Sequence, residues 1–309
     1  MSQKGRSNCD GTQHPRNVGT GMATVTRRAR VSMVVIFVIL VVSLMMGRLS
    51  VEPFVSPIYK SFIPLVYTSH APAKGVGLKH GNCVGVNNLG VEWFYNWGFD
   101  SSSGGICNND KQYVDMIFGA SNMSDTIKTP HLMGFNEYNQ TDQGNLTPTR
   151  AAMLWRVIES VHSDKYLVSP SGGSSLTTLW AMVDTYRALY GTYPRFDAIS
   201  VHWYDSHSGG TTLQSYLSSM HMGAVARGYN GKLWLTEFAS CTGNTEYKIT
   251  KMREWMDWLA TTGYVERWAW YAGRLSSIDV FDQVCQSDLM NSDGTLTPLG
   301  VAYRDWPKR

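Results

Sequence analysis

Two glutamates follow short apolar runs at points where the chain turns. Glu137 ends the segment GFNE (134–137), and Glu237 lies in the segment WLTEF (234–238). Hydrolysis of a glycosidic bond needs two facing carboxyl groups: one protonates the leaving oxygen, and the other attacks the sugar or activates water. In a barrel of parallel strands, the carboxyl ends of the strands meet at one mouth, where the active site lies. The two segments therefore predict a glycosidase, with Glu137 as acid/base and Glu237 as nucleophile.

Polar and aromatic side chains near other predicted strand ends extend this candidate site. The amide of Asn136, beside Glu137, can bond a sugar 2-hydroxyl. His202 and Tyr204 end another apolar run, and a hydrogen bond from either one would hold Glu237 ionised. Flat aromatic rings stack on sugar faces, and amides bind sugar hydroxyls. On these grounds we expect four further residues to bind substrate: Tyr95, Asn96, Trp97 and Trp270.

Other catalytic schemes find less support. The segment SGGS (171–174) lacks the G-x-S-x-G pattern of a nucleophile elbow. The chain has no H-E-x-x-H zinc motif and no glycine-rich phosphate loop with a lysine in place. We therefore expect neither a metal nor a cofactor.

The elements that must position these residues begin at Lys74. From there, short apolar strands alternate with helical stretches, which is typical of parallel βα units. The strands are expected at 75–78, 91–97, 113–118, 131–136, 166–169, 196–203, 232–236 and 265–271, with little helix after the third. The helices are expected at 147–161, 176–189, 213–227 and 247–261, and the segment 296–306 closes the ring. Eight strands within residues 74–309 predict a compact (β/α)₈ TIM barrel.

The preceding part of the chain divides into three segments. A basic tail (1–30) precedes an uncharged apolar run that we extend to 31–49 (Val31 to Leu49), and a proline-containing stem follows (50–73). The apolar run is near the lower end of the length that spans a bilayer, and a cleavable signal peptide is the main alternative. Basic residues on its N-terminal side place that end in the cytosol. We therefore expect a single-pass type II membrane protein with a lumenal or extracellular catalytic domain.

Charge and cysteine usage fit that location. The net charge is +3, and the excess of basic residues lies before residue 31, so no nucleic-acid partner is expected. Four cysteines follow the apolar run, and we prefer the pairs Cys83–Cys107 and Cys241–Cys285 among the three possible connectivities. Sequons begin at Asn122, Asn139 and Asn145. We expect a monomer.

An ordered set of segments resembles glycoside hydrolase family 128, the β-1,3-glucanases whose barrel is called the glycosyl hydrolase catalytic core. The segments are YNW (95–97), MGFNE (133–137), NLTP (145–148), HWYD (202–205), LTEF (235–238), YVER (264–267) and LTPLG (296–300). The resemblance implies a retaining, endo-acting enzyme on β-1,3-glucan, with Glu137 as acid/base and Glu237 as nucleophile. One departure is Tyr138, which stands where the family usually has a proline.

Two other functions remain open. The barrel could be a membrane-anchored glucan-binding protein with little or no turnover, although a binding module has no need of both glutamates. It could also be a glycosidase for another β-linked polysaccharide, such as xylan or mannan, because the catalytic pair is common to many such barrels.

Overall fold

The computed structural model describes residues 72–79, 83–99, 112–275 and 277–307. The predicted basic tail, the apolar run 31–49 and nearly all of the stem lie outside these residues. Within the described ranges, no helix has the length and apolar character needed to cross a bilayer.

The strands pair in parallel throughout. One sheet has the order β3-β2-β1-β9-β8-β7 and a second has the order β4-β5-β6. The strands are β1 (Ala73–Gly77), β2 (Trp93–Tyr95), β3 (Gln112–Tyr113), β4 (Asp115–Met116), β5 (His131–Met133), β6 (Tyr166–Val168), β7 (Ile199–Tyr204), β8 (Leu233–Ala239) and β9 (Val265–Tyr271). Each predicted strand is present within a few residues of its expected bounds, so the parallel α/β class is confirmed.

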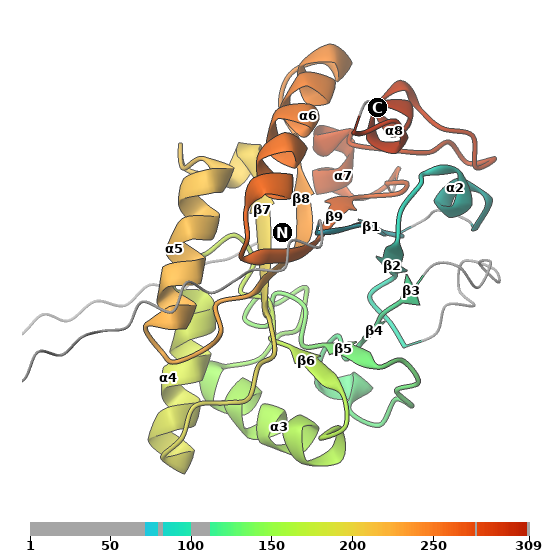
Figure 1. Cartoon of the computed structure of the whole chain (residues 1–309). Helices are drawn as coiled ribbons and strands as arrows, with labels where there is room; N and C mark the ends of the chain where they lie inside the picture. The colour runs from blue at the N-terminus through green and yellow to red at the C-terminus, as the bar shows by residue number, and fades with distance from the viewer. Residues whose placement is uncertain (1–71, 80–82, 100–111, 276, 308–309) are drawn as a thin grey trace, which may run out of the picture. The chain divides into compact units, whose positions relative to one another are not determined.

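The two sheets come together at two points. Val168 at the end of β6 forms a parallel bridge with Ala198, the residue before β7. Only Val114 separates β3 from β4. In Figure 1 the labels β7, β8, β9, β1, β2, β3, β4, β5 and β6 follow one another around a common centre.

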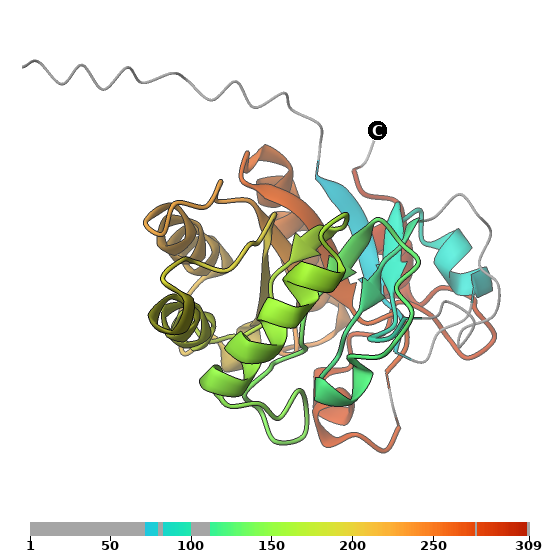
Figure 2. The same ribbon diagram turned by 90° about the horizontal axis from the view of Figure 1, so that it is seen from below.

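Helices lie outside the strands, as Figures 1 and 2 show. They are α2 (Cys83–Asn88), α3 (Pro148–Val161), α4 (Thr178–Tyr190), α5 (Leu213–Val225), α6 (Thr245–Thr261), α7 (Val280–Cys285) and α8 (Pro298–Arg304). Local capping sets where they begin: Thr147 accepts from the amide of Arg150, with Pro148 in the first turn, and Asn244 accepts from the amide of Tyr247. Only a short 3₁₀ turn, η2 (Ala120–Asn122), lies between β4 and β5, as the sequence predicted.

Alternation along each strand divides the core into two layers. Trp93, Tyr95, Met133 and Trp234 pack with one another in a cluster surrounded by strands. The intervening residues, such as Phe94, pack against the helices. Much of the tryptophan content is therefore core.

The disulfide Cys241–Cys285 confirms one predicted pair. It joins the loop after β8 to the last residue of α7. Cys83 is also disulfide-bonded, and its predicted partner Cys107 lies outside the described residues.

Candidate active site

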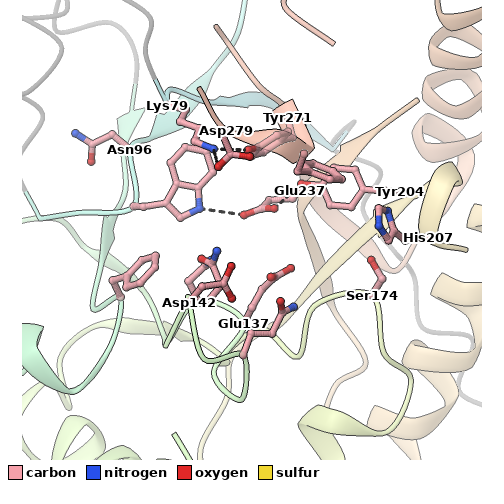
Figure 3. A pocket seen from close by; sticks show the side chains of 16 residues that line it. Lys79, Asn96, Glu137, Asp142, Ser174, Tyr204, His207, Glu237, Tyr271 and Asp279 are labelled. Atoms are coloured by element: carbon pink, nitrogen blue, oxygen red, sulfur yellow. Dashed lines mark hydrogen bonds and ion pairs between the residues drawn. The ribbon is translucent and has the colours of Figure 1, made fainter. Parts of the chain in front are cut away.

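Glu137 and Glu237 lie at the same end of the strands. Glu137 is in the turn after β5, and Glu237 lies within β8, which extends beyond its predicted end to Ala239. Both line a cavity of about 610 Å³, a size typical of ligand sites. In Figure 3 the two carboxyl groups approach the same space from opposite sides.

Irregular strand pairing turns the site residues toward this cavity. His202 on β7 is paired with Glu237 on β8, and the register of that pairing shifts between Val201 and His202. The pairing of β8 with β9 also shifts, between Leu235 and Phe238. Such bulges redirect side chains and are common next to active sites.

Both carboxylate oxygens of Glu237 accept hydrogen bonds. The Tyr204 hydroxyl donates to Oε2 at 2.5 Å, and the Trp97 indole Nε1 donates to Oε1 at 2.9 Å. Burial raises the pKa of Glu237, and the charge of Glu137 adds to this, while His202, Tyr204 and Trp97 act in the opposite direction. The pKa of Glu237 is raised overall, because its side chain is almost entirely removed from water.

His202 bridges the two glutamates. Its Nδ1 lies 2.9 Å from Glu137 Oε1 and 3.3 Å from Glu237 Oε2. Burial by itself would lower the pKa of His202, but the carboxyl groups of Glu237 and Glu137 together raise it. Its buried Nε2 has no hydrogen-bond partner, which is less costly for a lone pair than for an N–H, so we place the ring proton on Nδ1. Of the two predicted partners of Glu237, Tyr204 therefore makes the shorter contact, and His202 contacts both carboxyl groups.

The two carboxyl groups are close. Oxygens of Glu137 and Glu237 and the His202 nitrogen lie within 4.8 Å of one another. Three such ligands could hold a metal ion, but protein donors already occupy both oxygens of Glu237. Retaining glycosidases place their carboxyl groups roughly 5–5.5 Å apart, whereas inverting enzymes need roughly 6.5–9.5 Å to admit a water. The arrangement therefore suits a nucleophile and an acid/base better than a metal centre.

The backbone is strained at two cavity residues. Glu137 has a φ of +36° and Trp97 a φ of +61°, values that side-chain-bearing residues rarely adopt. Tyr138, at the position where the resemblance to family 128 implies a proline, stabilises the turn after Glu137. Its amide donates to Ser171 O at 3.0 Å, a bond that proline lacks, and its buried hydroxyl donates to Thr178 O at 2.6 Å.

The other predicted substrate-binding residues are placed differently from one another. Asn136 lines the cavity; its Nδ2 donates to Gln143 Oε1 at 3.0 Å, and its buried Oδ1 has no partner. Asn96 also lines the cavity and accepts from the Tyr113 hydroxyl. Tyr95 is fully buried and does not line it.

Trp270 was predicted wrongly. It is fully buried on the helix-facing side of β9, with its ring 5.1 Å from that of Phe238, and its Nε1 donates to Ser287 O. Tyr271 lines the cavity instead. Strand alternation places Trp270 and Tyr271 on opposite faces, so the prediction had the wrong phase.

One wall of the cavity was missed in the sequence. Lys79, after β1, forms ion pairs with Asp279 at 3.3 Å and Asp282 at 2.9 Å, and its Nζ lies 2.9 Å from the Tyr271 hydroxyl. Phe281 of α7 belongs to the same wall. Only Tyr271 had a sequence signal, its position at a strand end; the α7 segment follows no periodic pattern.

Known proteins share this fold and parts of this sequence. A family profile described as "Glycosyl hydrolase catalytic core" matches residues 71–303. Alkali-sensitive linkage protein 1 of Schizosaccharomyces pombe is 26% identical over 233 residues, which are 70% of this chain and 40% of that protein. The present chain thus spans less than half the length of that curated relative.

Solved structures agree on the fold. A subgroup II endo-β-1,3-glucanase of glycoside hydrolase family 128 from Sorangium cellulosum has a TM-score of 0.62 and 23% identity, covering 77% of this chain and 99% of that one. A mutant of a subgroup I endo-β-1,3-glucanase from Amycolatopsis mediterranei, in complex with laminarihexaose, has a TM-score of 0.60 and 25% identity, covering 75% and 98%.

Proposed function

Since the chain belongs to the glycosyl hydrolase catalytic-core family, we propose that it cleaves β-1,3-glucan with retention of the anomeric configuration. The family predicted from the sequence is confirmed by the profile match. The substrate is proposed from the structural relatives, which are endo-β-1,3-glucanases, one of them in complex with laminarihexaose.

The observation that carries the mechanism is the short distance between the carboxyl groups. One carboxylate oxygen of Glu137 lies within 4.8 Å of one carboxylate oxygen of Glu237. In the first step, Glu237 attacks the anomeric carbon and the glycosidic C–O bond breaks. Glu137 gives its proton to the departing oxygen, and a glycosyl ester forms on Glu237. In the second step, Glu137 takes a proton from water, whose oxygen displaces the ester carboxylate and restores the free enzyme.

The surrounding groups support these roles. The Trp97 and Tyr204 donors stabilise the ionised nucleophile. The unpartnered Oδ1 of Asn136 gives a buried acceptor to a substrate hydroxyl beside Glu137. A substrate bound in the cavity would thus give the Asn136 Oδ1 atom the hydrogen-bond partner that the protein does not supply.

Product analysis by proton NMR tests this proposal. The full chain is incubated with laminarin, xylan and mannan, and the anomer of the first product is followed before mutarotation. We expect laminari-oligosaccharides, released first as the β-anomer. The α-anomer would contradict retention, and release only from xylan or mannan would contradict the substrate. Binding of laminarin without any product, by a demonstrably folded protein, would support the binding-protein alternative.

We extend the proposal to the whole fold. The bridge between Val168 and Ala198 and the adjacency of β3 and β4 support one closed (β/α)₈ barrel over residues 74–309. A crystal structure in which strands β6 and β7 diverge would contradict closure.

We also propose that the apolar run 31–49 is a signal-anchor that holds the chain in a membrane. Release of the full chain from membranes by alkaline carbonate would contradict this proposal.

A further inference from the structure

Strand β2 contacts the segment that carries Glu237, although the two strands are not neighbours. In the sheet order β2-β1-β9-β8, two strands lie between β2 and β8. The Tyr95 hydroxyl donates to the carbonyl oxygen of Thr236 at 2.8 Å, and Trp97 Nε1 donates to Glu237 Oε1 at 2.9 Å. Two consecutive residues of β8 are thus bound by Tyr95, the last residue of β2, and by Trp97, two residues beyond it.

Packing fixes the orientation of the Trp97 indole. Its ring centroid lies 4.7 Å from that of Tyr95 and, edge to face, 5.8 Å from that of Tyr271. Gly77 at the end of β1 completes the enclosure, because a Cβ there would lie 2.8 Å from Trp97 Cη2 and 3.3 Å from the Tyr95 hydroxyl. The indole therefore has little freedom to turn away from Glu237.

The backbone conformation agrees with a fixed role. Trp97 adopts a φ of +61°, a conformation that is unfavourable for a residue with a side chain and persists only where surrounding contacts hold it. That conformation directs the indole N–H at a carboxylate rather than leaving it to solvent. A ring that served only to stack on sugar would not need this donor contact.

We propose that Trp97 and Tyr95 are positioning residues, here called the β2 clamp, which orient Glu237 and keep it ionised. This inference rests on the proposed role of Glu237 as nucleophile. It assigns the two side chains a task other than the sugar binding predicted from the sequence. Tyr95 donates to the carbonyl oxygen of Thr236, the residue before Glu237, and so fixes the backbone there. Trp97 donates to one carboxylate oxygen of Glu237.

Glu237 also faces other titratable groups, so the effect of the clamp must be separated from theirs. Tyr204 and His202 face it from β7, Glu137 from the turn after β5, and Tyr271 from β9. The Trp97 hydrogen bond lowers the pKa of Glu237 against the effect of burial. Losing this bond must therefore raise that pKa further.

The first variant is Trp97→Phe, which keeps an aromatic ring and removes the N–H. We expect kcat/KM on laminarin to fall about 10- to 100-fold, which corresponds to one charge-assisted hydrogen bond. The acid limb of the pH profile should move to higher pH, because a larger share of Glu237 is then protonated at any given pH. The matched control is Trp93→Phe on β2, since the Trp93 indole donates to the carbonyl oxygen of Ala73 and not to a carboxylate. It should leave the acid limb in place.

Two more variants test the clamp while keeping the Trp97 side chain itself unchanged. Gly77→Ala inserts a methyl group against the indole and should move the acid limb in the same direction as Trp97→Phe. Tyr95→Phe removes the bond to Thr236 and should lower kcat with KM unchanged. Its control is Tyr229→Phe, which removes a hydroxyl that donates to the carbonyl oxygen of Pro194.

A readout independent of turnover separates the clamp from the proposed function. The Glu237 carboxyl carbon is titrated by ¹³C NMR in protein labelled at glutamate, with Glu237→Gln used to assign the signal. A wild-type protein that hydrolyses no glucan would refute the proposed function, and the titration would still test the clamp. An unchanged Glu237 titration in folded Trp97→Phe would overturn the clamp, as would a raised KM with unchanged kcat and pH profile, the result expected for stacking.

Discussion

At the scale of single residues, the two glutamates have different surroundings. Glu237 is 5% exposed and receives donors on both oxygens, whereas Glu137 is more open to the cavity and contacts His202 Nδ1. Two carboxyl groups with different environments can take different roles in one reaction. The donors on Glu237 favour its ionised form, which attack on a sugar requires.

Leaving-group dependence distinguishes these roles. Glu137→Gln should lower hydrolysis of laminari-oligosaccharides by about 10²–10⁴-fold, because the leaving oxygen then lacks its proton donor. An aryl β-laminaribioside with an acidic phenol needs no such proton, so its phenol should be released in a burst. Glu237→Gln should lower both reactions by about 10⁴-fold or more, since no glycosyl ester can form. Stopped-flow detection of phenol is the measurement, and equal losses of Glu137→Gln on both substrates would contradict its role as acid.

At the scale of elements, the turn after β5 is held by Tyr138. Its amide and hydroxyl bond to Ser171 and Thr178, which lie between β6 and α4 and at the start of α4. A proline at this position would keep neither bond. Tyr138 thus connects the turn that carries Glu137 to the next βα unit.

Removing the Tyr138 hydroxyl should destabilise the fold. Tyr138→Phe loses one buried hydrogen bond and should lower the free energy of unfolding by about 1–2 kcal/mol in urea denaturation. Tyr138→Pro also loses the amide bond and the buried ring, and it should cost about 3 kcal/mol or more. Tyr247→Phe, at a ring that is 43% exposed, is the control and should change little. Equal stability of Tyr138→Phe and the wild type would show that the hydroxyl does not support the turn.

The disulfide secures the wall that contains α7. Cys285 ends α7, and the Lys248 ammonium donates to the carbonyl oxygen of Cys285 at 2.6 Å and to that of Gln286 at 3.1 Å. The disulfide joins Cys241 to Cys285, which are 44 residues apart in the sequence. Replacing both Cys241 and Cys285 by Ser should lower the free energy of unfolding by about 2–4 kcal/mol. This variant is preferable to a reductant, because Cys83 is also disulfide-bonded; an unchanged urea midpoint would contradict the prediction.

Sequence reasoning reached the strands and both glutamates because each strand is a short apolar run bounded by turn or loop residues. It did not reach the cavity wall made by Lys79, Asp279 and Phe281. Those residues come from the segment after β1 and from the start of the short helix α7, whose placement depends on long-range ion pairs and a disulfide. The error at Trp270 has a different origin: the strand was correct, but aromatic residues on both faces of β9 hid which face points inward.

At the scale of the whole molecule, the opposite ends of the strands carry different polar groups. His131 begins β5, the strand that leads to Glu137, and Arg267 lies near the start of β9. Arg267 Nη1 donates to Gln112 Oε1 at 2.6 Å, and its guanidinium lies 4.4 Å from the centre of the Trp234 ring. The two glutamates thus lie at one end of the strands and a structural cluster lies at the other.

That structural cluster should make stability depend on pH. Burial of the half-buried His131, together with the neighbouring Arg267 charge, lowers its pKa from 6.5 to about 4, although Glu266 acts in the opposite direction. Nδ1 lies 3.0 Å from Gln112 Nε2, and Nε2 lies 3.3 Å from Arg267 Nη2. The neutral ring has one lone pair and can accept from one of these donors, whereas the protonated ring can accept from neither. The unfolded chain therefore binds the proton first as pH falls, so the contribution of neutral His131 is complete above pH 6.5 and is lost between 6.5 and about 4.

The variant His131→Gln isolates this contribution, because glutamine does not titrate. Between pH 6.5 and 4 the wild type should lose about 1–2 kcal/mol more unfolding free energy than the variant, a figure reduced for solvent screening of a half-buried ring. Urea denaturation of both proteins across that range measures the difference, and parallel curves would contradict it. Because His131 lies at the end of β5 away from Glu137, the variant should keep the wild-type pH dependence of kcat. A shift in that profile would instead couple the two ends of the strands.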